Sequence, residues 1–170
     1  MNIQALETRQ QIYEFIQSHP GMHFREMQRR LGIAVGTLQH HLAQLEKEKL
    51  VIGRKDGEYT RYFPVGTMTE RDRFLLKFLR QAPLRRALLL LLERPSANHR
   101  QISERLRLSP ATTSWYLGKL LEAGLIERKK VGREAHYSLK DAKEMARMLV
   151  AYRESFFDKL VDRFAELWMK

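Results

Sequence analysis

The chain has 170 residues, of which 44% are hydrophobic, enough for one ordinary domain or two small ones with apolar cores. It contains no cysteine, which excludes disulfides and cysteine-ligated metal sites. The formal net charge of +11 favours a polyanionic partner, either DNA, RNA or acidic lipid. Residues 141–170 are nearly neutral, so the positive excess lies in the rest of the chain.

The N-terminal part of the chain predicts three helices followed by a β-hairpin. Leu6, Ile12, Phe15 and Ile16 fit one face of a helix that ends at residues 19–21, His-Pro-Gly. We expect a second helix over 24–31, a tight turn over 32–34 and a third helix over 35–49. A strand then begins at 50–52, and a second strand covers 59–63. The dipeptide Asp56-Gly57 predicts a type I′ turn between the strands. This order of elements is that of a winged helix-turn-helix.

The middle of the chain predicts a connecting helix and then the same order again. Thr69–Arg80 reads as a helix that Thr69 caps, and Pro83 suits the first turn of a helix that continues through Leu92. Further helices are expected over 99–106 and 110–122, separated by a turn over 107–109, and strands over 125–130 and 135–139. Ser109 is the predicted N-cap of the third helix of this copy.

An internal repeat explains this recurrence. Shifted by 75 residues, the sequence matches itself without a gap from Ile12 to Pro64. Identical pairs include Pro20 with Pro95, Arg25 with Arg100, Leu42 with Leu117, Gly57 with Gly132 and Tyr62 with Tyr137. Leucines, a glycine and an aromatic residue that match in one register disfavour a chance likeness between two helical segments.

A final helix is predicted from Asp141 to about Met169, with apolar residues at steps of four and three that form a continuous stripe. This stripe must be buried against another copy of the chain or within the chain itself, for instance against residues 74–79. We favour a homodimer, because a twofold dimer suits palindromic DNA sites. The predicted dimerisation residues are Met145, Leu149, Tyr152, Phe156, Leu160, Phe164 and Leu167.

The expected fold class is therefore α+β, mainly helical with small β-hairpins. It consists of two tandem winged helix-turn-helix modules and a long C-terminal helix. The predicted boundaries are 1–67 for the first module, 68–82 for the connecting helix, 83–140 for the second module and 141–170 for the C-terminal helix.

The third helix of a helix-turn-helix enters the major groove, so its exposed polar side chains are the candidates for contact with base edges. Cations on the hairpins and second helices are candidates for contact with phosphate or the minor groove. The predicted DNA-binding residues of the first copy are Arg25, Thr37, Gln39, His40, Gln44, Arg54, Lys55 and Arg61. Those of the second copy are Arg100, Thr112, Ser114, Trp115, Lys119, Arg128, Lys129, Lys130 and Arg133. Two roles stay open for Trp115, stacking on a sugar or base and contact with another protein.

The third helices resemble those of known families. Residues 36–45, GTLQHHLAQL, resemble the recognition helix of the ArsR-type winged-helix repressors, and residues 111–126 are similar to the same segment in archaeal winged-helix regulators. The tandem arrangement resembles archaeal transcription regulators with two such modules, over about residues 8–66 and 83–140. The resemblance implies a winged-helix fold and binding to double-stranded DNA. The absence of cysteine departs from the ArsR metal sensors, so metal sensing is not implied.

Other functions remain open at this point, namely a non-specific architectural DNA- or RNA-binding protein and a winged-helix protein-interaction scaffold. We expect no enzyme, catalytic residue or cofactor, because the sequence has no phosphate-binding glycine loop, cysteine nucleophile or convergent carboxylate pair. We expect no metal site, since the adjacent His40 and His41 point about 100° apart on a helix. We expect a soluble cytoplasmic protein without a membrane partner, because no signal-peptide pattern is visible and the longest apolar run, Ala87–Leu92, is too short to cross a bilayer.

Overall fold

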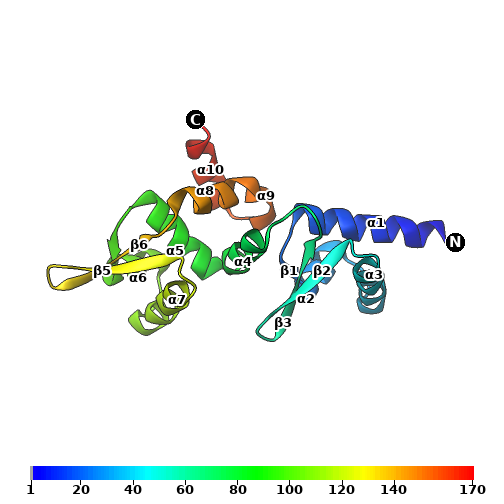
Figure 1. The fold of residues 1–170 in the computed structure, drawn as a ribbon, viewed down its shortest axis with the longest axis horizontal. Helices are drawn as coiled ribbons and strands as arrows, with labels where there is room; N and C mark the ends of the chain where they lie inside the picture. Colours follow the sequence, from blue (N-terminus) through cyan, green and yellow to red (C-terminus); the bar gives the residue numbers. More distant parts are fainter. Residues whose placement is uncertain (1) are drawn as a thin grey trace. The chain divides into compact units, whose positions relative to one another are not determined.

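The computed structural model describes residues 2–170, which form ten helices and six short strands. They divide into two compact units. The first unit extends to Arg80 and includes Glu154–Phe157, and the second comprises Gln81–Arg153 and Asp158–Lys170. Each unit contains helices and one three-stranded antiparallel sheet, which confirms the predicted α+β class (Figure 1).

The first unit has the predicted order of three helices and a hairpin. Its elements are α1 (Ile3–Ser18), β1 (Met22–His23), α2 (Phe24–Leu31), α3 (Val35–Lys47), β2 (Val51–Asp56), β3 (Tyr59–Pro64) and α4 (Glu70–Leu79). The sheet order is β1-β3-β2, so the hairpin returns to pair with the short strand that precedes α2. Thr69 caps α4 in a capping box with Asp72, as the sequence predicts for the cap.

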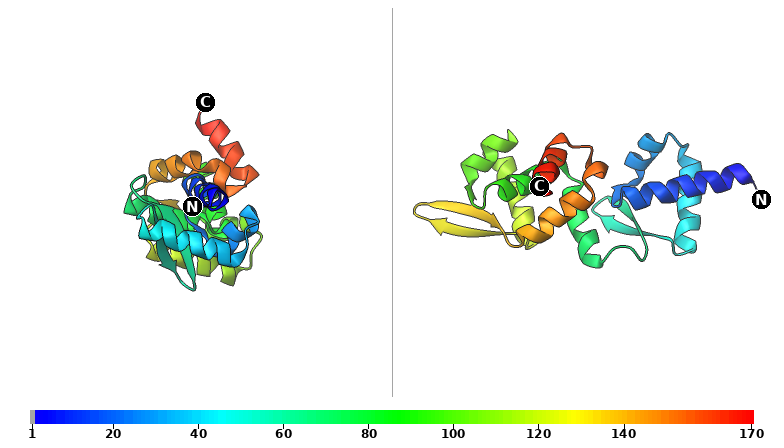
Figure 2. Two further views of the ribbon diagram at one scale, coloured as in Figure 1. Left: turned by 90° about the vertical axis from the view of Figure 1, so that its right-hand side faces the viewer. Right: turned by 90° about the horizontal axis from the view of Figure 1, so that it is seen from above.

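The second unit repeats this fold. Its elements are α5 (Ala82–Glu93), β4 (Ala97–Asn98), α6 (His99–Leu106), α7 (Pro110–Glu122), β5 (Ile126–Val131) and β6 (Glu134–Leu139). From β4 to β6 every bound is the bound of the matching element of the first unit moved by 75 residues. The strand register is also conserved, since Met22 faces Tyr62 in the first sheet and Ala97 faces Tyr137 in the second. The β5–β6 hairpin extends beyond the helices of its own unit (Figure 2).

Local side chains define the ends of these elements. Ser109 accepts a hydrogen bond from the Thr112 backbone N–H and begins α7, with Pro110 behind it, which confirms the predicted cap. The predicted type I′ turn is wrong in kind. Asp56 pairs with Tyr59, so Gly57 and Glu58 form the two-residue turn, and only Gly57 has a positive φ, at 62°. A positive φ on the first turn residue alone is the pattern of a type II′ turn.

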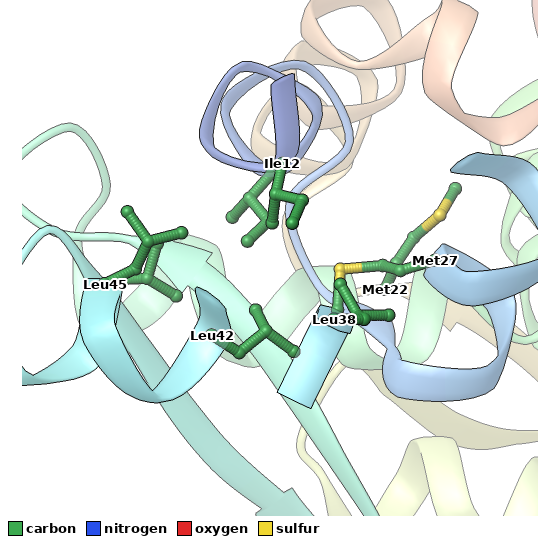
Figure 3. Close-up of a cluster of buried hydrophobic side chains, with 8 residues drawn as sticks. Ile12, Met22, Met27, Leu38, Leu42 and Leu45 are labelled. Carbon is green, nitrogen blue, oxygen red and sulfur yellow. The ribbon is translucent and has the colours of Figure 1, made fainter. Parts of the chain in front are cut away.

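The core of the first unit positions α3. Leu38, Leu42 and Leu45 lie on one face of α3 and pack with Ile12 of α1 and Met27 of α2, each at most 2% exposed (Figure 3). Because these side chains are fixed, the opposite face of α3 is held toward solvent. The prediction that Leu6 shares the buried face of α1 is wrong, since Leu6 is 42% exposed and α1 buries only residues further along the helix.

The second unit has a polar residue in its core at the place of Leu38. Thr113 of α7 is 0% exposed, and among residues 2–170 its hydroxyl has no hydrogen-bond partner. A buried hydroxyl without a partner costs about 1–3 kcal/mol of stability. We therefore expect Thr113→Val, which keeps the shape of the side chain, to raise the free energy of unfolding by about 1 kcal/mol.

Urea unfolding followed by circular dichroism measures this change. Thr112→Val is the matched control, because the Thr112 hydroxyl accepts a hydrogen bond from Ser109 Oγ at 2.8 Å. It should leave stability unchanged or lower it. A lower stability for Thr113→Val would show that the hydroxyl is satisfied in solution.

The C-terminal stretch differs from the continuous helix expected over residues 141–169. It forms α8 (Ala142–Ala151), α9 (Arg153–Phe156) and α10 (Lys159–Trp168). Phe157 breaks the helical backbone with a φ of 51°, and the Asp158 side chain accepts a hydrogen bond from the Leu160 backbone N–H, capping α10. Because aspartate can bond the backbone outside a helix, it favours a new N-terminus over helix continuation.

This break also changes the use of the apolar stripe. Met145, Leu149, Phe156 and Phe164 are at most 9% exposed in the single chain, and α8 and α10 pack against each other. Met145, Leu149 and Phe164 are therefore not available to a second copy as long as this packing persists, and the Arg80 guanidinium lies over the ring of Phe156, at 4.9 Å from its centre. Tyr152 is half-buried, and only Leu160 and Leu167 of the predicted stripe are exposed, at 46% and 66%.

A short C-terminal segment is held by the first unit. The Arg80 guanidinium donates hydrogen bonds to Pro20 O at 2.6 and 2.9 Å and to Ser155 O and Oγ at 2.8 and 2.9 Å. The Arg30 guanidinium lies 3.7 Å from the centre of the Phe157 ring, which also stacks on His19. These contacts explain why residues 154–157 group with the first unit although they follow the second copy in the chain. Among residues 2–170, no helix has both the length and the apolar character needed to cross a membrane.

Candidate nucleic-acid interface

The outward face of α3 contains the predicted base-contacting side chains of the first copy. Thr37, Gln39 and His40 are exposed, and Gln44 is partly exposed. The adjacent His41 is buried instead, and burial lowers the pKa of its imidazole. The structure thus separates the two histidines, and only His40 is available for a hydrogen bond to a base edge.

The outward face of α7 differs in chemistry from that of α3. Ser114 and Trp115 are exposed, whereas Thr112 and Lys119 are partly exposed. The Lys119 ammonium lies 3.9 Å from the centre of the Trp115 ring, and Ser114 Oγ lies 2.8 Å from Nε2 of His99. The Trp115 side chain is 57% exposed, so it presents an apolar ring surface directly beside the positive charge of Lys119.

The first hairpin, residues 51–64, is called wing one below. Arg54 and Lys55 are exposed on it, as predicted for phosphate contacts. Arg61 is not: its side chain is 8% exposed, donates to Asp56 Oδ2 at 2.7 Å and donates to Gly21 O at 3.0 Å. Arg61 could reach a phosphate only by leaving both partners, so we remove it from the candidate interface.

The second hairpin, residues 126–139, is called wing two. Arg128, Lys129, Lys130 and Arg133 are all exposed. Lys129 forms an ion pair with Glu127 at 2.9 Å on the same strand, and the pKa of the Glu127 carboxyl is lowered by that hydrogen bond. Wing two therefore presents four cations at the surface of its unit.

The second helices also contain the predicted arginines. Arg25 of α2 is exposed, and Arg100 of α6 is exposed but forms an ion pair with Glu104 at 3.0 Å. Neighbouring arginines of α2, Arg29 and Arg30, both bind Glu26. Such exposed pairs contribute little to stability, so phosphates can compete for these arginines.

Sequence reasoning missed several residues that define the surface. His99 fixes Ser114, and Glu70 of α4 accepts hydrogen bonds from Arg73 at 2.7 Å and Arg54 at 2.8 Å, which lower the pKa of Glu70 to about 2. A concave surface of about 490 Å³ lies between α3 and wing one, and Glu46 and Glu58 line it. No local pattern marks His99 and Glu70, because Ser114 and Arg54 lie 15 and 16 residues away from them in the chain.

Within residues 2–170 no three His, Cys, Asp or Glu side chains lie close enough together to hold a metal ion. The surfaces of α3, α7 and the wings include hydrogen-bonding side chains and cations, which suit base edges and phosphates, beside the carboxylates of Glu46 and Glu58.

Family comparisons agree with the fold. Residues 6–76 match a model described as an N-terminal HTH domain, and residues 80–127 match a model described as winged helix-turn-helix DNA-binding. The chain thus contains two tandem helix-turn-helix domains, the second of which is a winged DNA-binding domain.

One curated relative is an uncharacterized HTH-type transcriptional regulator of Methanocaldococcus jannaschii, 34% identical over 136 residues. The match includes 80% of this chain but only 34% of that protein, so the chain spans about a third of the relative's length.

Solved structures give more distant likenesses. The transcriptional repressor BigR from Xylella fastidiosa is 23% identical, with a TM-score of 0.44, over 51% of this chain and 96% of that one. Lactococcus lactis ZitR in complex with DNA is 19% identical, with a TM-score of 0.36, over 79% of this chain and 82% of that one.

Proposed function

We propose that the protein is a transcription regulator that binds specific sequences in double-stranded DNA. The observation that supports this most directly is the repeated geometry of α3 and α7. In both copies buried side chains fix the third helix within its unit while polar side chains face outward. A third helix of this kind reads base edges in the major groove, and a basic wing contacts phosphate or the minor groove. The named class of the curated relative supports the same proposal.

The proposed DNA contacts are the predicted residues whose side chains are exposed or partly exposed. In the first module they are Arg25, Thr37, Gln39, His40, Gln44, Arg54 and Lys55. In the second they are Arg100, Thr112, Ser114, Trp115, Lys119, Arg128, Lys129, Lys130 and Arg133.

Fluorescence anisotropy tests this function. Labelled genomic duplexes, including the region upstream of the protein's own gene, are titrated at two salt concentrations with competitor DNA. A specific regulator retains one fragment with a Kd of about 10⁻⁸ M or tighter. Equal and strongly salt-dependent binding to every duplex would indicate an architectural protein instead. No binding at moderate salt would leave a protein-interaction role for the winged helices.

For the domain organisation we propose modules over 1–67 and 83–140, a connecting helix over 68–82 and a C-terminal region over 141–170. We further propose that two copies associate through the exposed part of the C-terminal region. Besides Leu160 and Leu167, this region also exposes Trp168 and Met169, which are 52% and 55% exposed. A second copy is the occupant that suits twofold DNA sites.

Light scattering coupled to size-exclusion chromatography tests the proposed dimer. We expect a dimer for the parent protein and a monomer for Leu167→Glu, because a carboxylate would be buried in the interface without a partner. Glu166→Gln, at the exposed neighbouring position, should leave the mass unchanged. A parent protein that elutes as a monomer at concentrations well above those used for DNA binding would contradict the proposal.

A further inference from the structure

The two wings share a backbone but differ in how their charges are paired. In wing one, Arg61 pairs with Asp56 at 2.7 Å and Arg54 pairs with Glu70 at 2.8 Å. Lys77 of α4 also lies 3.7 Å from Asp56. Of the three cations on wing one, only Lys55 has no ion pair within residues 2–170, and it is accompanied by the exposed carboxylate of Glu58.

The connecting helix α4 is the reason for this pairing. Thr69 caps α4 and thereby places Glu70 in its first turn, next to the hairpin. Glu70 then receives hydrogen bonds from Arg73 of its own helix and from Arg54 of β2. This carboxylate is ionised at neutral pH, so it competes with phosphate for Arg54, and because the pair is exposed it weakens the contact of Arg54 with DNA rather than preventing it.

Wing two has its two carboxylates, Glu127 and Glu134, at other positions of the hairpin, and none at the positions that match Asp56 and Glu58. The residues 75 positions after Asp56 and Glu58 are Val131 and Arg133, and the residue that matches Gly53 is Arg128. Lys129 pairs with Glu127, but Arg128, Lys130 and Arg133 form no ion pair with any residue that the structure describes. Three unpaired cations thus stand on wing two, against the single unpaired cation of wing one.

The surface between the third helix and the wing shows the same contrast. In the first unit Glu46 and Glu58 line this concave surface of about 490 Å³. The matching residues of the second copy are Leu121 and Arg133. Arg25 also lines the first surface, and Arg100 and Glu134 match Arg25 and Tyr59 in the second copy. A phosphate strand that passes between helix and wing would therefore meet two carboxylates and one guanidinium in the first module, but two guanidiniums and one carboxylate at the matching positions of the second, which attract it more strongly.

We infer that the two modules contribute unequally to DNA binding. Wing two supplies most of the electrostatic attraction to phosphates, and wing one contributes little to it. This inference rests on the proposed function, since it concerns the same DNA complex. It predicts that the cations of wing two account for most of the decrease in DNA affinity with rising salt. The first module would then contact DNA mainly through the polar side chains of α3.

Matched double variants test this unequal contribution. Lys130→Gln/Arg133→Gln removes two exposed cations from wing two, and Arg54→Gln/Lys55→Gln removes two from wing one. Binding of each to the tightest duplex found for the parent protein is measured by anisotropy at four or more salt concentrations. Each lost phosphate contact reduces the slope of log K against log salt by about 0.9. We expect the slope to fall by about 1.8 for the wing-two variant and by less than half of that for the wing-one variant.

A gain-of-charge variant provides a second readout. Glu58→Arg gives wing one the residue that wing two has at the matching position, and it should steepen the slope by about 0.9 if a phosphate strand passes there. Circular dichroism spectra that match the parent protein show that each variant is folded. Equal losses of slope in the two double variants, or a larger loss for wing one, would overturn this inference while leaving the proposed function intact. A parent protein that binds no duplex would overturn the proposed function and this inference together.

Discussion

Replacement of Arg85 by methionine is expected to lower the stability of the second unit by about 3–5 kcal/mol, because it leaves a buried carboxylate without its counter-charge. The Arg85 side chain extends from α5 and is 8% exposed, and that of Asp158 is 9% exposed. The Arg85 Nε and Nη2 atoms each lie 2.9 Å from Asp158 Oδ2. The other oxygen of Asp158 accepts the Leu160 backbone N–H at 3.0 Å, so the same carboxylate also begins α10.

Urea unfolding monitored by circular dichroism and by tryptophan fluorescence measures the effect of Arg85→Met. Trp115 and Trp168 lie in the second unit, so fluorescence reports on that unit alone. Arg86→Met is the matched control, because Arg86 is the next residue of α5 and is exposed; it should change stability by no more than about 0.5 kcal/mol. A loss below about 1 kcal/mol for Arg85→Met would indicate that water replaces the guanidinium at Asp158.

Leu38→Ala is expected to destabilise the first unit by about 2–5 kcal/mol. Leu38 is 0% exposed at the centre of the cluster drawn in Figure 3, next to Met27 and Leu42. Removal of its branched end leaves a cavity that the surrounding helices fill only in part, and that cavity adds to the lost burial of apolar surface. Because Leu38 fixes α3 within the unit, DNA binding should also weaken where the unit is partly unfolded.

Val35→Ala is the control for Leu38→Ala, since Val35 lies one turn earlier on α3 and is 50% exposed. It should change stability by no more than about 0.5 kcal/mol. Urea unfolding gives the stability of both variants, and anisotropy with the parent duplex gives their affinity at low temperature. If Leu38→Ala is as stable as Val35→Ala, then α3 is not fixed by this core, and the outward direction of Gln39 and His40 loses its physical basis.

The predictions for Leu38→Ala and Arg85→Met test two kinds of interaction, apolar packing and a buried ion pair. Leu38 belongs to the apolar face of the third helix, which both copies share at Leu42 and Leu117 although Thr113 replaces Leu38 in the second copy. Arg85 and Asp158 represent an ion pair in the second unit that has no counterpart in the repeat, since Asp158 lies outside the repeated segment. The repeat therefore accounts for the direction of the third helices, and the C-terminal stretch is held by contacts that each unit provides separately.

Much of the fold could be predicted from the sequence. The spacing of Leu38, Leu42 and Leu45 fixes the buried face of a helix whatever surrounds it, and Ser109-Pro110 defines a helix start through hydrogen bonds within one turn. The match at a shift of 75 residues showed that the second copy has the fold of the first. Exposure of Gln39, His40 and Ser114 followed from the same periodicity, because residues beside a buried stripe must face away from it.

Only the tertiary structure shows which charged side chains are buried and which form ion pairs, because sequence periodicity carries no information on distant partners. The sequence shows Arg61 as a cation in a hairpin, but its burial depends on Gly21, a hydrogen-bond acceptor 40 residues away in the chain. It shows apolar residues at helical steps from Met145 to Leu167, but the backbone breaks at Phe157, and the Asp158 side chain that begins α10 also binds Arg85, 73 residues away. Helix faces and caps depend on neighbours within a turn, and for this reason the sequence by itself determined the two winged helix-turn-helix copies. Burial and ion pairing depend on which distant residues the folded chain brings together, so only the tertiary structure decided which cations of the wings remain available to DNA.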